Sequence, residues 1–140
     1  MHSEWSWDAP GGAMERTCAR AVELGLRAVA FTEHADYEPW TVLASDLVGR
    51  PHLAAVTSPD LILTPPPLDL DGYLECLQRC RELFPQLRIL AGVELGEPHR
   101  HVDAAAPLLA AGRFERVLGS LHCLPLDGGY AEMGSLYRRL

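Results

Sequence analysis

The sequence contains no lysine and no asparagine, and acidic residues outnumber basic ones. All 12 basic residues are arginine, set against 19 aspartates and glutamates, so the formal net charge is −7. A surface that binds nucleic acid needs a basic face, and this charge therefore argues against nucleic acid as a partner. The same acidity suits a protein that holds cations.

Long apolar runs are also missing. No stretch of 18 consecutive apolar residues occurs, so the sequence predicts no membrane-spanning helix and no membrane partner. Residues 1–8 lack the basic-then-apolar pattern of a secretory signal peptide, and we expect a cytoplasmic protein. With 48% hydrophobic and 22% charged residues, the 140-residue chain has the composition of a single globular domain with a core.

The four cysteines form no Cys-x-x-Cys motif. Cys76 and Cys80 are four residues apart and could share one helix face, which leaves a zinc site or a disulfide open. Reduced thiols buried in the core are the favoured interpretation for a cytoplasmic protein.

The apolar pattern predicts helices alternating with short buried strands. We expect helices over residues 14–24, 69–84 and 102–111, and strands over 28–31, 88–93 and 116–121. This order predicts an α/β fold with parallel strands and outer helices. The proline-rich segment 37–67 reads as a long connection with one short helix near 41–48, and its role stays open. Beyond a turn at Gly128–Gly129, a further helix could begin over 132–140.

Each predicted strand leads into a residue that can bind a metal. The first strand runs into a polar turn containing His34, the second ends at Glu94, and the third ends at His122. The carboxyl ends of parallel strands meet at one edge of a sheet, where ligands collect. With the early residues His2 and Asp8, this set of imidazoles and carboxylates suits zinc, manganese or iron. Glu94 is the candidate to bridge two metals, an arrangement that favours hydrolysis of phosphate esters.

Four ordered stretches resemble successive motifs of the PHP (polymerase and histidinol phosphatase) superfamily, and are most similar to its histidinol-phosphatase branch. They are residues 1–8, 31–36, 92–99 and 118–123, so the resemblance covers essentially the whole chain. It implies the N-terminal part of a distorted seven-stranded β/α barrel, with a trinuclear divalent-metal centre at the carboxyl ends of the strands. The implied reaction is hydrolysis of L-histidinol phosphate, a small phosphorylated substrate, to L-histidinol and phosphate in histidine biosynthesis.

The resemblance also implies roles for individual residues. His2 matches the second histidine of the family's opening His-x-His, and His122 matches the histidine of its Gly-Ser-x-His motif. Asp8 and His34 would share one metal, His2 and Glu94 another, and Glu94 and His122 the third. Glu94, His34 and Asp8 are the expected catalytic residues. Residues expected to contact substrate or to orient ligands are Glu33, Asp36, His99, Arg100 and His101, and Arg100 is best suited to bidentate contact with oxygen.

The sequence also departs from the family pattern. Met1 stands where the residue between the two opening histidines is expected, and no histidine follows His122. We therefore expect residues 1–140 to be one partial PHP domain without its C-terminal strands, truncated at both ends and incomplete as a phosphatase. Two alternatives stay open: another PHP phosphoesterase, such as a nuclease, or a non-catalytic metal-binding fragment or half-barrel that pairs with another chain. The oligomeric state is not predicted.

Overall fold

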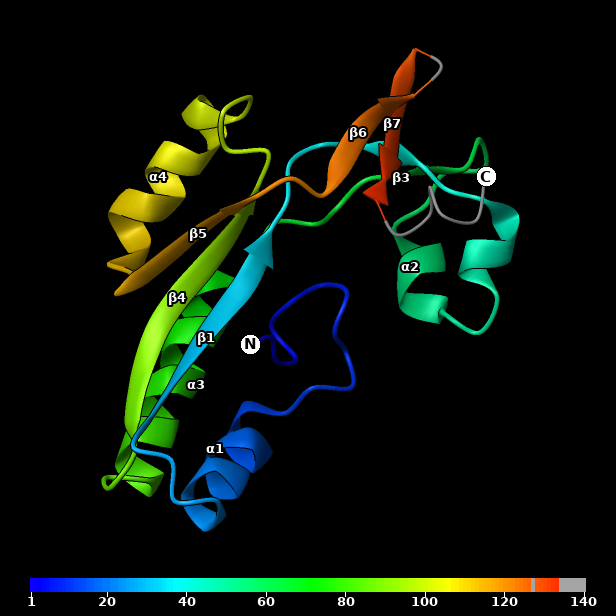
Figure 1. Ribbon diagram of the computed structural model, residues 1–140. Helices are drawn as coiled ribbons and strands as arrows, with labels where there is room; N and C mark the ends of the chain where they lie inside the picture. The colour runs from blue at the N-terminus through cyan, green and yellow to red at the C-terminus, as the bar shows by residue number, and fades with distance from the viewer. Residues whose placement is uncertain (127, 134–140) are drawn as a thin grey trace.

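A three-stranded parallel sheet forms the centre of the structure, a computed structural model that describes residues 1–126 and 128–133 (Figure 1). Its strand order is β1 (Ala28–Ala35), β4 (Arg88–Gly96) and β5 (Arg116–Ser120). The helices between or before these strands are α1 (Met14–Glu23), α3 (Leu70–Leu83) and α4 (Val102–Gly112). The α/β fold with parallel strands and outer helices is confirmed.

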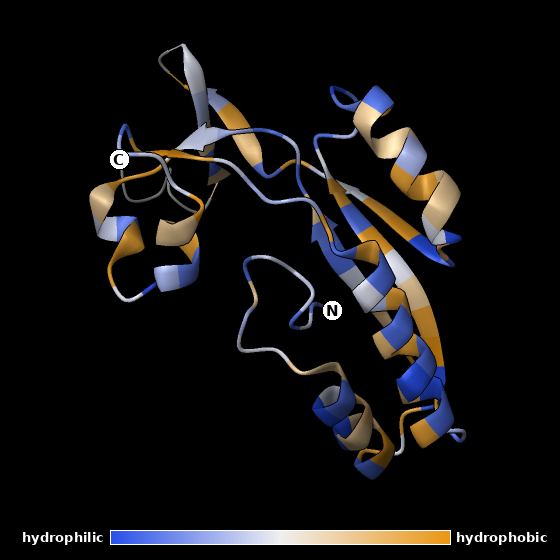
Figure 2. Ribbon diagram, turned by 180° about the vertical axis from the view of Figure 1, so that it is seen from behind, coloured by the Kyte–Doolittle hydropathy of each residue, from blue (hydrophilic) through white to orange (hydrophobic). Residues whose placement is uncertain are grey.

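The two faces of the sheet differ in what they contact. Odd-numbered residues of β1 and β4 pack against the helices: Val29, Phe31, Ile89 and Ala91 share a core cluster with α1 and α3. Val93 and Leu95 continue this face into a second cluster with α4. Because side chains alternate along a strand, the even-numbered residues, including His34 and Glu94, lie on the opposite face. Figure 2 shows the hydrophobic sides of α1 and α3 turned toward the sheet.

Helix α3 is fixed at its start and in its middle. The side chain of Asp69 caps the helix by accepting a hydrogen bond of 3.1 Å from the Gly72 amide. The buried hydroxyl of Tyr73 lies 3.0 Å from the Phe31 carbonyl, the Gly92 carbonyl and the Gly92 amide. This hydroxyl ties α3 to both β1 and β4.

The four cysteines are free and buried. Cys18, on α1, shares the core cluster with Cys76 and Cys80, on α3. The predicted location of these thiols in the core is thus confirmed. Burial raises the pKa of the Cys80 thiol to about 12, since a thiolate in the apolar core would be poorly solvated.

Strand β1 is longer than expected. The apolar pattern predicts that this strand ends at Phe31 and that residues 33–36 form a turn, and this prediction is wrong. The parallel register with β4 continues through the pairs His34↔Glu94 and Ala35↔Leu95, so the polar residues remain in the ladder. Apolar Ala35 still faces α4 while His34 faces the other side, which is the alternation that a strand requires.

Segment 37–67 is not an irregular connection. It contains β2 (Trp40–Thr41) and β3 (Ile62–Leu63), which pair antiparallel, together with a 3-10 helix η1 (Ala44–Leu47) and a short helix α2 (Pro51–Ala55). The short helix expected near 41–48 is therefore the 3-10 turn. Trp40, Val42 and Leu63 form a small core of their own with Cys123.

A β-hairpin that the sequence analysis did not predict completes this small unit. It consists of β6 (Cys123–Leu126) and β7 (Gly129–Glu132), and β7 lies against β2. Glu132 belongs to β7, and the rest of the helix expected over 132–140 falls almost entirely outside the described residues. Within the described ranges, no helix has the length and apolarity needed to cross a membrane.

Candidate metal centre

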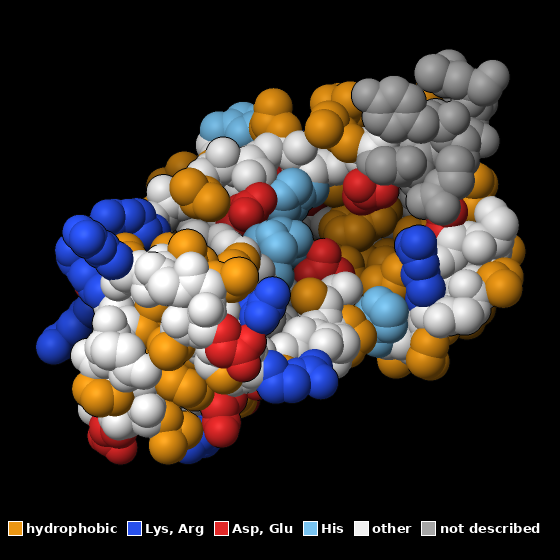
Figure 3. All heavy atoms as spheres, turned by 60° about the horizontal axis from the view of Figure 1, so that its bottom comes forward, with side chains coloured by type: hydrophobic (Ala, Val, Ile, Leu, Met, Phe, Trp, Pro, Cys, Tyr) orange, Lys and Arg blue, Asp and Glu red, His pale blue; other side chains and the backbone are white. Residues whose placement is uncertain are grey.

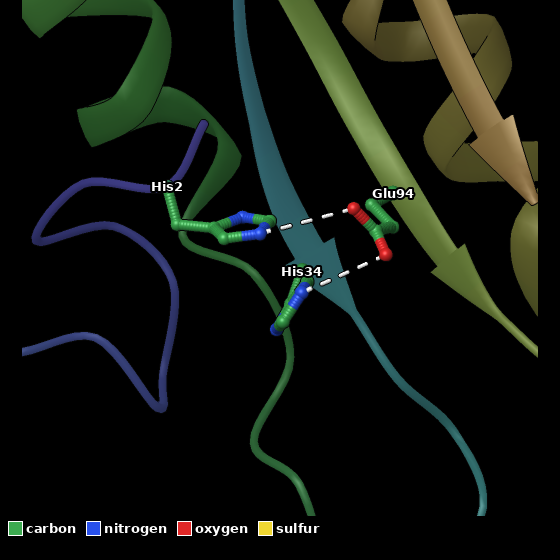
Figure 4. Close-up of side chains that lie close together, drawn as sticks. All are labelled: His2, His34 and Glu94. Atoms are coloured by element: carbon green, nitrogen blue, oxygen red, sulfur yellow. Dashed lines mark ion pairs between the residues drawn. The ribbon is translucent and has the colours of Figure 1, made fainter. Parts of the chain in front are cut away.

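Two neighbouring strands and the N-terminal segment bring His2, His34 and Glu94 together (Figure 4). His34 and Glu94 are direct partners in the β1–β4 register, so the ladder itself places them side by side. His2 Nε2 lies 3.8 Å from Glu94 Oε2, and His34 Nε2 lies 3.9 Å from Glu94 Oε1. One ligand atom from each residue lies within 4.8 Å of the other two, which is a spacing that a shared cation could close.

His122 joins the group from the residues that follow β5. Its Nε2 lies 3.1 Å from Glu94 Oε1, and its ring centroid is 4.9 Å from that of His34. Ser120, at the end of β5, donates a hydrogen bond of 2.7 Å to the same Glu94 oxygen. The three strand ends therefore converge as predicted, and together with His2 from the N-terminal segment they surround one carboxylate with three imidazoles.

All three imidazoles have the same orientation. Each presents Nε2 to Glu94, while Nδ1 lies on another oxygen: the Thr32 carbonyl at 2.8 Å for His2, the Asp8 carboxylate at 3.0 Å for His34, and Asp36 Oδ1 at 2.7 Å for His122. An acceptor at Nδ1 keeps the proton there and leaves the Nε2 lone pair for a metal. Asp8 lies beside the remote nitrogen of His34, and it is absent from the group that shares the 4.8 Å spacing.

His2 is held in place although it lies in no helix or strand. The fully buried carboxylate of Glu33 accepts bonds from the Ser3 amide at 2.9 Å, the Ser3 hydroxyl at 2.6 Å and the Ser6 hydroxyl at 2.6 Å. The Thr32 amide in turn donates to the Met1 carbonyl at 2.9 Å. These bonds dock the N-terminal segment along β1 and direct His2 toward Glu94.

Asp36 holds His122 and is itself held from the other side. Its side chain is 2% exposed, and its second oxygen accepts a bond of 2.9 Å from Trp7 Nε1. Gly96 makes the room for this contact, since a Cβ there would collide with Asp36 Oδ1 and lie 3.3 Å from His122 Nδ1. Asp36 is thus an orienting residue, which is one of the two roles that the sequence analysis expected for it.

Glu97 is a further site residue, one that sequence reasoning missed. It is 1% exposed, and its Oε1 accepts bonds from the backbone amides of His122 at 2.5 Å and Cys123 at 2.8 Å. These bonds fix the chain at the point where β5 gives way to β6. The only signal in the sequence is the acidic residue itself, which does not reveal its backbone partners.

Charge attraction within the centre shifts the pKa values of its residues. The hydrogen bond to Asp36 raises the pKa of His122 to about 9, against a smaller opposing effect of burial. Burial alone would lower the pKa of His34 and raise that of Asp8, but their mutual hydrogen bond and attraction reverse both directions. Burial would likewise raise the pKa of Glu94, but hydrogen bonds with Ser120 and His122 lower it. Without a metal, the carboxylates of Asp8, Asp36 and Glu94 thus favour the protonated forms of His34 and His122.

A cavity of 510 Å³ opens beside this centre. Figure 3 shows it as a hollow with an apolar floor, bounded on one side by histidine and acidic side chains and on the other by an arginine beside a histidine. Its lining includes Asp8, His34, Asp36 and His122 on the metal side, and residues of η1, α2 and β7 elsewhere. The apolar part is made by Trp7, Trp40, Val42, Leu53 and Leu63.

The residues predicted to bind substrate lie near this region but in other contacts. Arg100 and His101 both contact Glu38 Oε2, at 2.9 and 3.0 Å, and the Arg100 guanidinium lies 3.9 Å over the Tyr130 ring. His99 is exposed. The lining of the cavity includes none of the three, whereas it does include Arg50 and His52, which the sequence analysis did not select as site residues.

The donor set fits a borderline divalent cation. Imidazole nitrogens and a carboxylate are the ligands of zinc, manganese and iron sites in proteins. The Nδ1 partners of the three histidines match the outer contacts that such sites use to fix imidazole orientation. The geometry accordingly suits at least one divalent ion at Glu94.

Comparison with known proteins gives a family match and several structural neighbours. The family model described as PHP domain matches residues 1–139. The histidinol phosphate phosphatase of Lactococcus lactis subsp. lactis, solved with zinc, L-histidinol and phosphate, is 19% identical with a TM-score of 0.65. A candidate histidinol phosphatase from Listeria monocytogenes has the same identity and the same TM-score. No curated protein sequence matches the chain.

The aligned region is a large share of this chain but a smaller share of each structural neighbour. The aligned parts cover 91% and 94% of this chain but 40% and 46% of the two neighbours. The chain therefore spans less than half the length of the structures it resembles. At 19% identity this likeness establishes the fold alone, and the sheet with its outer helices corresponds to part of the neighbours' barrel.

Proposed function

Because the chain belongs to the PHP domain family, we propose that it forms part of a metal-dependent phosphomonoester hydrolase. The observation that supports this most directly is the shared orientation of His2, His34 and His122, whose Nε2 atoms all turn toward Glu94. A cluster of this kind at the carboxyl ends of parallel strands, beside a cavity of 510 Å³, is the arrangement expected of a metallohydrolase.

The proposed ligands are His2, His34, Glu94 and His122, with Glu94 as the bridging carboxylate. The family resemblance adds Asp8 as a fifth, although its carboxylate contacts Nδ1 of His34 in this structure. A trinuclear centre of zinc, manganese or iron is the form that the family resemblance implies. Bound metal would supply a water molecule of lowered pKa as nucleophile and would neutralise charge on the phosphoryl group. The chain's own residues hold the imidazoles: Asp36 and the Thr32 carbonyl fix two of them through Nδ1.

The proposed substrate is L-histidinol phosphate. The cavity is lined by the indole rings of Trp7 and Trp40, whose centroids are 5.7 Å apart, and by the acidic residues Asp46 and Glu132. Aromatic faces and acidic groups favour a small planar leaving group that carries positive charge. Histidinol, with an imidazole ring and an amine, has this chemistry, and the Lactococcus neighbour was solved with it.

The test is phosphate release by the chain after reconstitution with Zn²⁺ or Mn²⁺. We expect L-histidinol phosphate to be hydrolysed faster than p-nitrophenyl phosphate, and a phosphodiester such as bis-p-nitrophenyl phosphate to be hydrolysed least. Glu94→Gln should abolish turnover, whereas Glu23→Gln, on the exposed side of α1, should not. Complementation of a histidine auxotroph that lacks histidinol phosphatase would test the proposed place in histidine biosynthesis.

The two alternatives predict different outcomes of the same assay. Faster hydrolysis of the phosphodiester would favour another PHP phosphoesterase over a histidinol phosphatase. Stoichiometric metal binding that depends on Glu94, with no hydrolysis of any substrate, would contradict catalysis by this chain and favour a metal-binding module.

A further inference from the structure

We propose that Arg50, with His52 beside it, is the contact for phosphoryl oxygens on the wall of the cavity opposite the metal centre. This inference rests on the proposed function and assigns a role to segment 37–67. The chemical class recognised is the dianion of a phosphate monoester, or inorganic phosphate as the product.

The fold places both side chains at the cavity. Arg50 is the residue before α2, and Pro51 occupies the first turn of that helix. Arg50, His52 and Leu53 all line the same 510 Å³ cavity as Asp8, His34 and His122. Leu53 also packs against the small core of Trp40, Val42 and Leu63, so α2 is anchored rather than free.

Other arginines near the site are already engaged. Arg100, the residue that sequence reasoning favours for contact with phosphate, binds Glu38 and stacks on Tyr130. Within the described part of the chain, Arg50 is the one arginine that lines the cavity, and no ion pair of its guanidinium with a described carboxylate occurs. Its charge is therefore available to a ligand.

The acidity of the cavity favours such a contact. Four acidic residues line it, Asp8, Asp36, Asp46 and Glu132, and a phosphate dianion among them gains from a cationic partner. Metal ions at Glu94 would offset this charge on one wall only. A guanidinium on the other wall presents a planar fork of N–H donors that matches two phosphate oxygens, and a histidine beside it adds a further donor.

The test is binding of inorganic phosphate to the metal-loaded chain, measured by calorimetry or ³¹P NMR. We expect Arg50→Gln to weaken phosphate binding roughly tenfold or more, Arg50→Lys to weaken it less, and His52→Gln to have a smaller effect than Arg50→Gln. The Leu53 amide bonds to the backbone carbonyl of Arg50, so the side-chain change leaves this turn intact. Arg27→Gln, exposed at the opposite end of β1, is the matched control and should not alter phosphate affinity.

The outcomes separate this inference from the proposed function. If the metal-loaded chain hydrolyses phosphomonoesters but Arg50→Gln leaves both phosphate affinity and KM unchanged, the role of Arg50 is refuted while the function stands. If phosphate binds in an Arg50-dependent manner without hydrolysis, the proposed catalysis fails and the anion contact stands. Absence of phosphate binding by the metal-loaded wild type would also refute the contact. Equal metal content and circular dichroism across the variants would show that each comparison is made between folded proteins.

Discussion

The contact between Asp36 and His122 predicts a measurable change in proton affinity. We expect Asp36→Asn to lower the pKa of His122 in the metal-free chain from about 9 toward the value of about 6.5 for an unperturbed imidazole. The bond between His122 Nδ1 and Asp36 Oδ1 is 2.7 Å long, and the Asp36 side chain is 2% exposed, so water screens the attraction little. Glu94, 3.1 Å from Nε2, would retain part of the shift.

The size of the effect follows from the two pKa values. A difference of about 2.5 units corresponds to roughly 3 kcal/mol between the charged and neutral forms, and Asp36 is its largest cause. Because the folded-state pKa is raised, the stabilisation is fully present below pH of about 6.5 and is lost as pH rises through about 9. The metal-free wild type should therefore lose about 2 kcal/mol of unfolding free energy between roughly pH 7 and pH 10, and Asp36→Asn should lose less.

The assay is an NMR titration of the imidazole Cε1–H signals of the metal-free chain, with His122 identified by His122→Gln. Asp8→Asn is the matched control, because Asp8 bonds to His34 and should leave His122 nearly unchanged. A wild-type His122 that titrates near pH 6.5 would refute the reasoning. So would an Asp36→Asn chain whose His122 still titrates near pH 9.

The remaining predictions concern what fixes the site to the sheet. Glu33→Gln should lower the unfolding free energy by roughly 2 kcal/mol in urea titrations, because its amide group would meet the N–H and O–H donors of Ser3 and Ser6. It should also weaken zinc binding, since His2 would lose its anchor, whereas the exposed control Glu23→Gln should change neither quantity. Tyr73→Phe should lower the unfolding free energy by about 1–3 kcal/mol, because the buried Gly92 amide would lose its acceptor, and an unchanged urea midpoint would contradict this.

The sheet and the centre could be predicted because both follow from local patterns. Apolar runs in a parallel α/β order put the strand ends together, and His34, Glu94 and His122 each stand at such an end. The end of β1 was misplaced because a run of polar residues resembles a turn. The alternation of His34 with Ala35 was the signal of a continuing strand, but it is too short to be decisive without the partner strand.

Segment 37–67 could not be predicted in the same way. Strands β2 and β3 have two residues each, which is too short for any periodicity, and β2 lies against the distant strand β7. The assignment of Arg100 to substrate relied on the chemistry of its side chain. The residue type alone does not reveal that Arg100 contacts Glu38 and Tyr130. Nor does it reveal that Arg50 lines the cavity.

The acidic residues of the centre show why a ligand cannot be identified from residue type. Glu33, Asp36, Glu94 and Glu97 have the same chemistry, and the donors around each one separate their roles. Glu33 accepts three bonds from serine groups, Asp36 is held by Trp7 and His122, and Glu97 accepts two backbone amides on one oxygen. Glu94 differs because its two oxygens face the Nε2 atoms of His2 at 3.8 Å and His34 at 3.9 Å, beyond hydrogen-bond range. A carboxylate grouped with two imidazole nitrogens at that spacing is the one placed to share a cation with them.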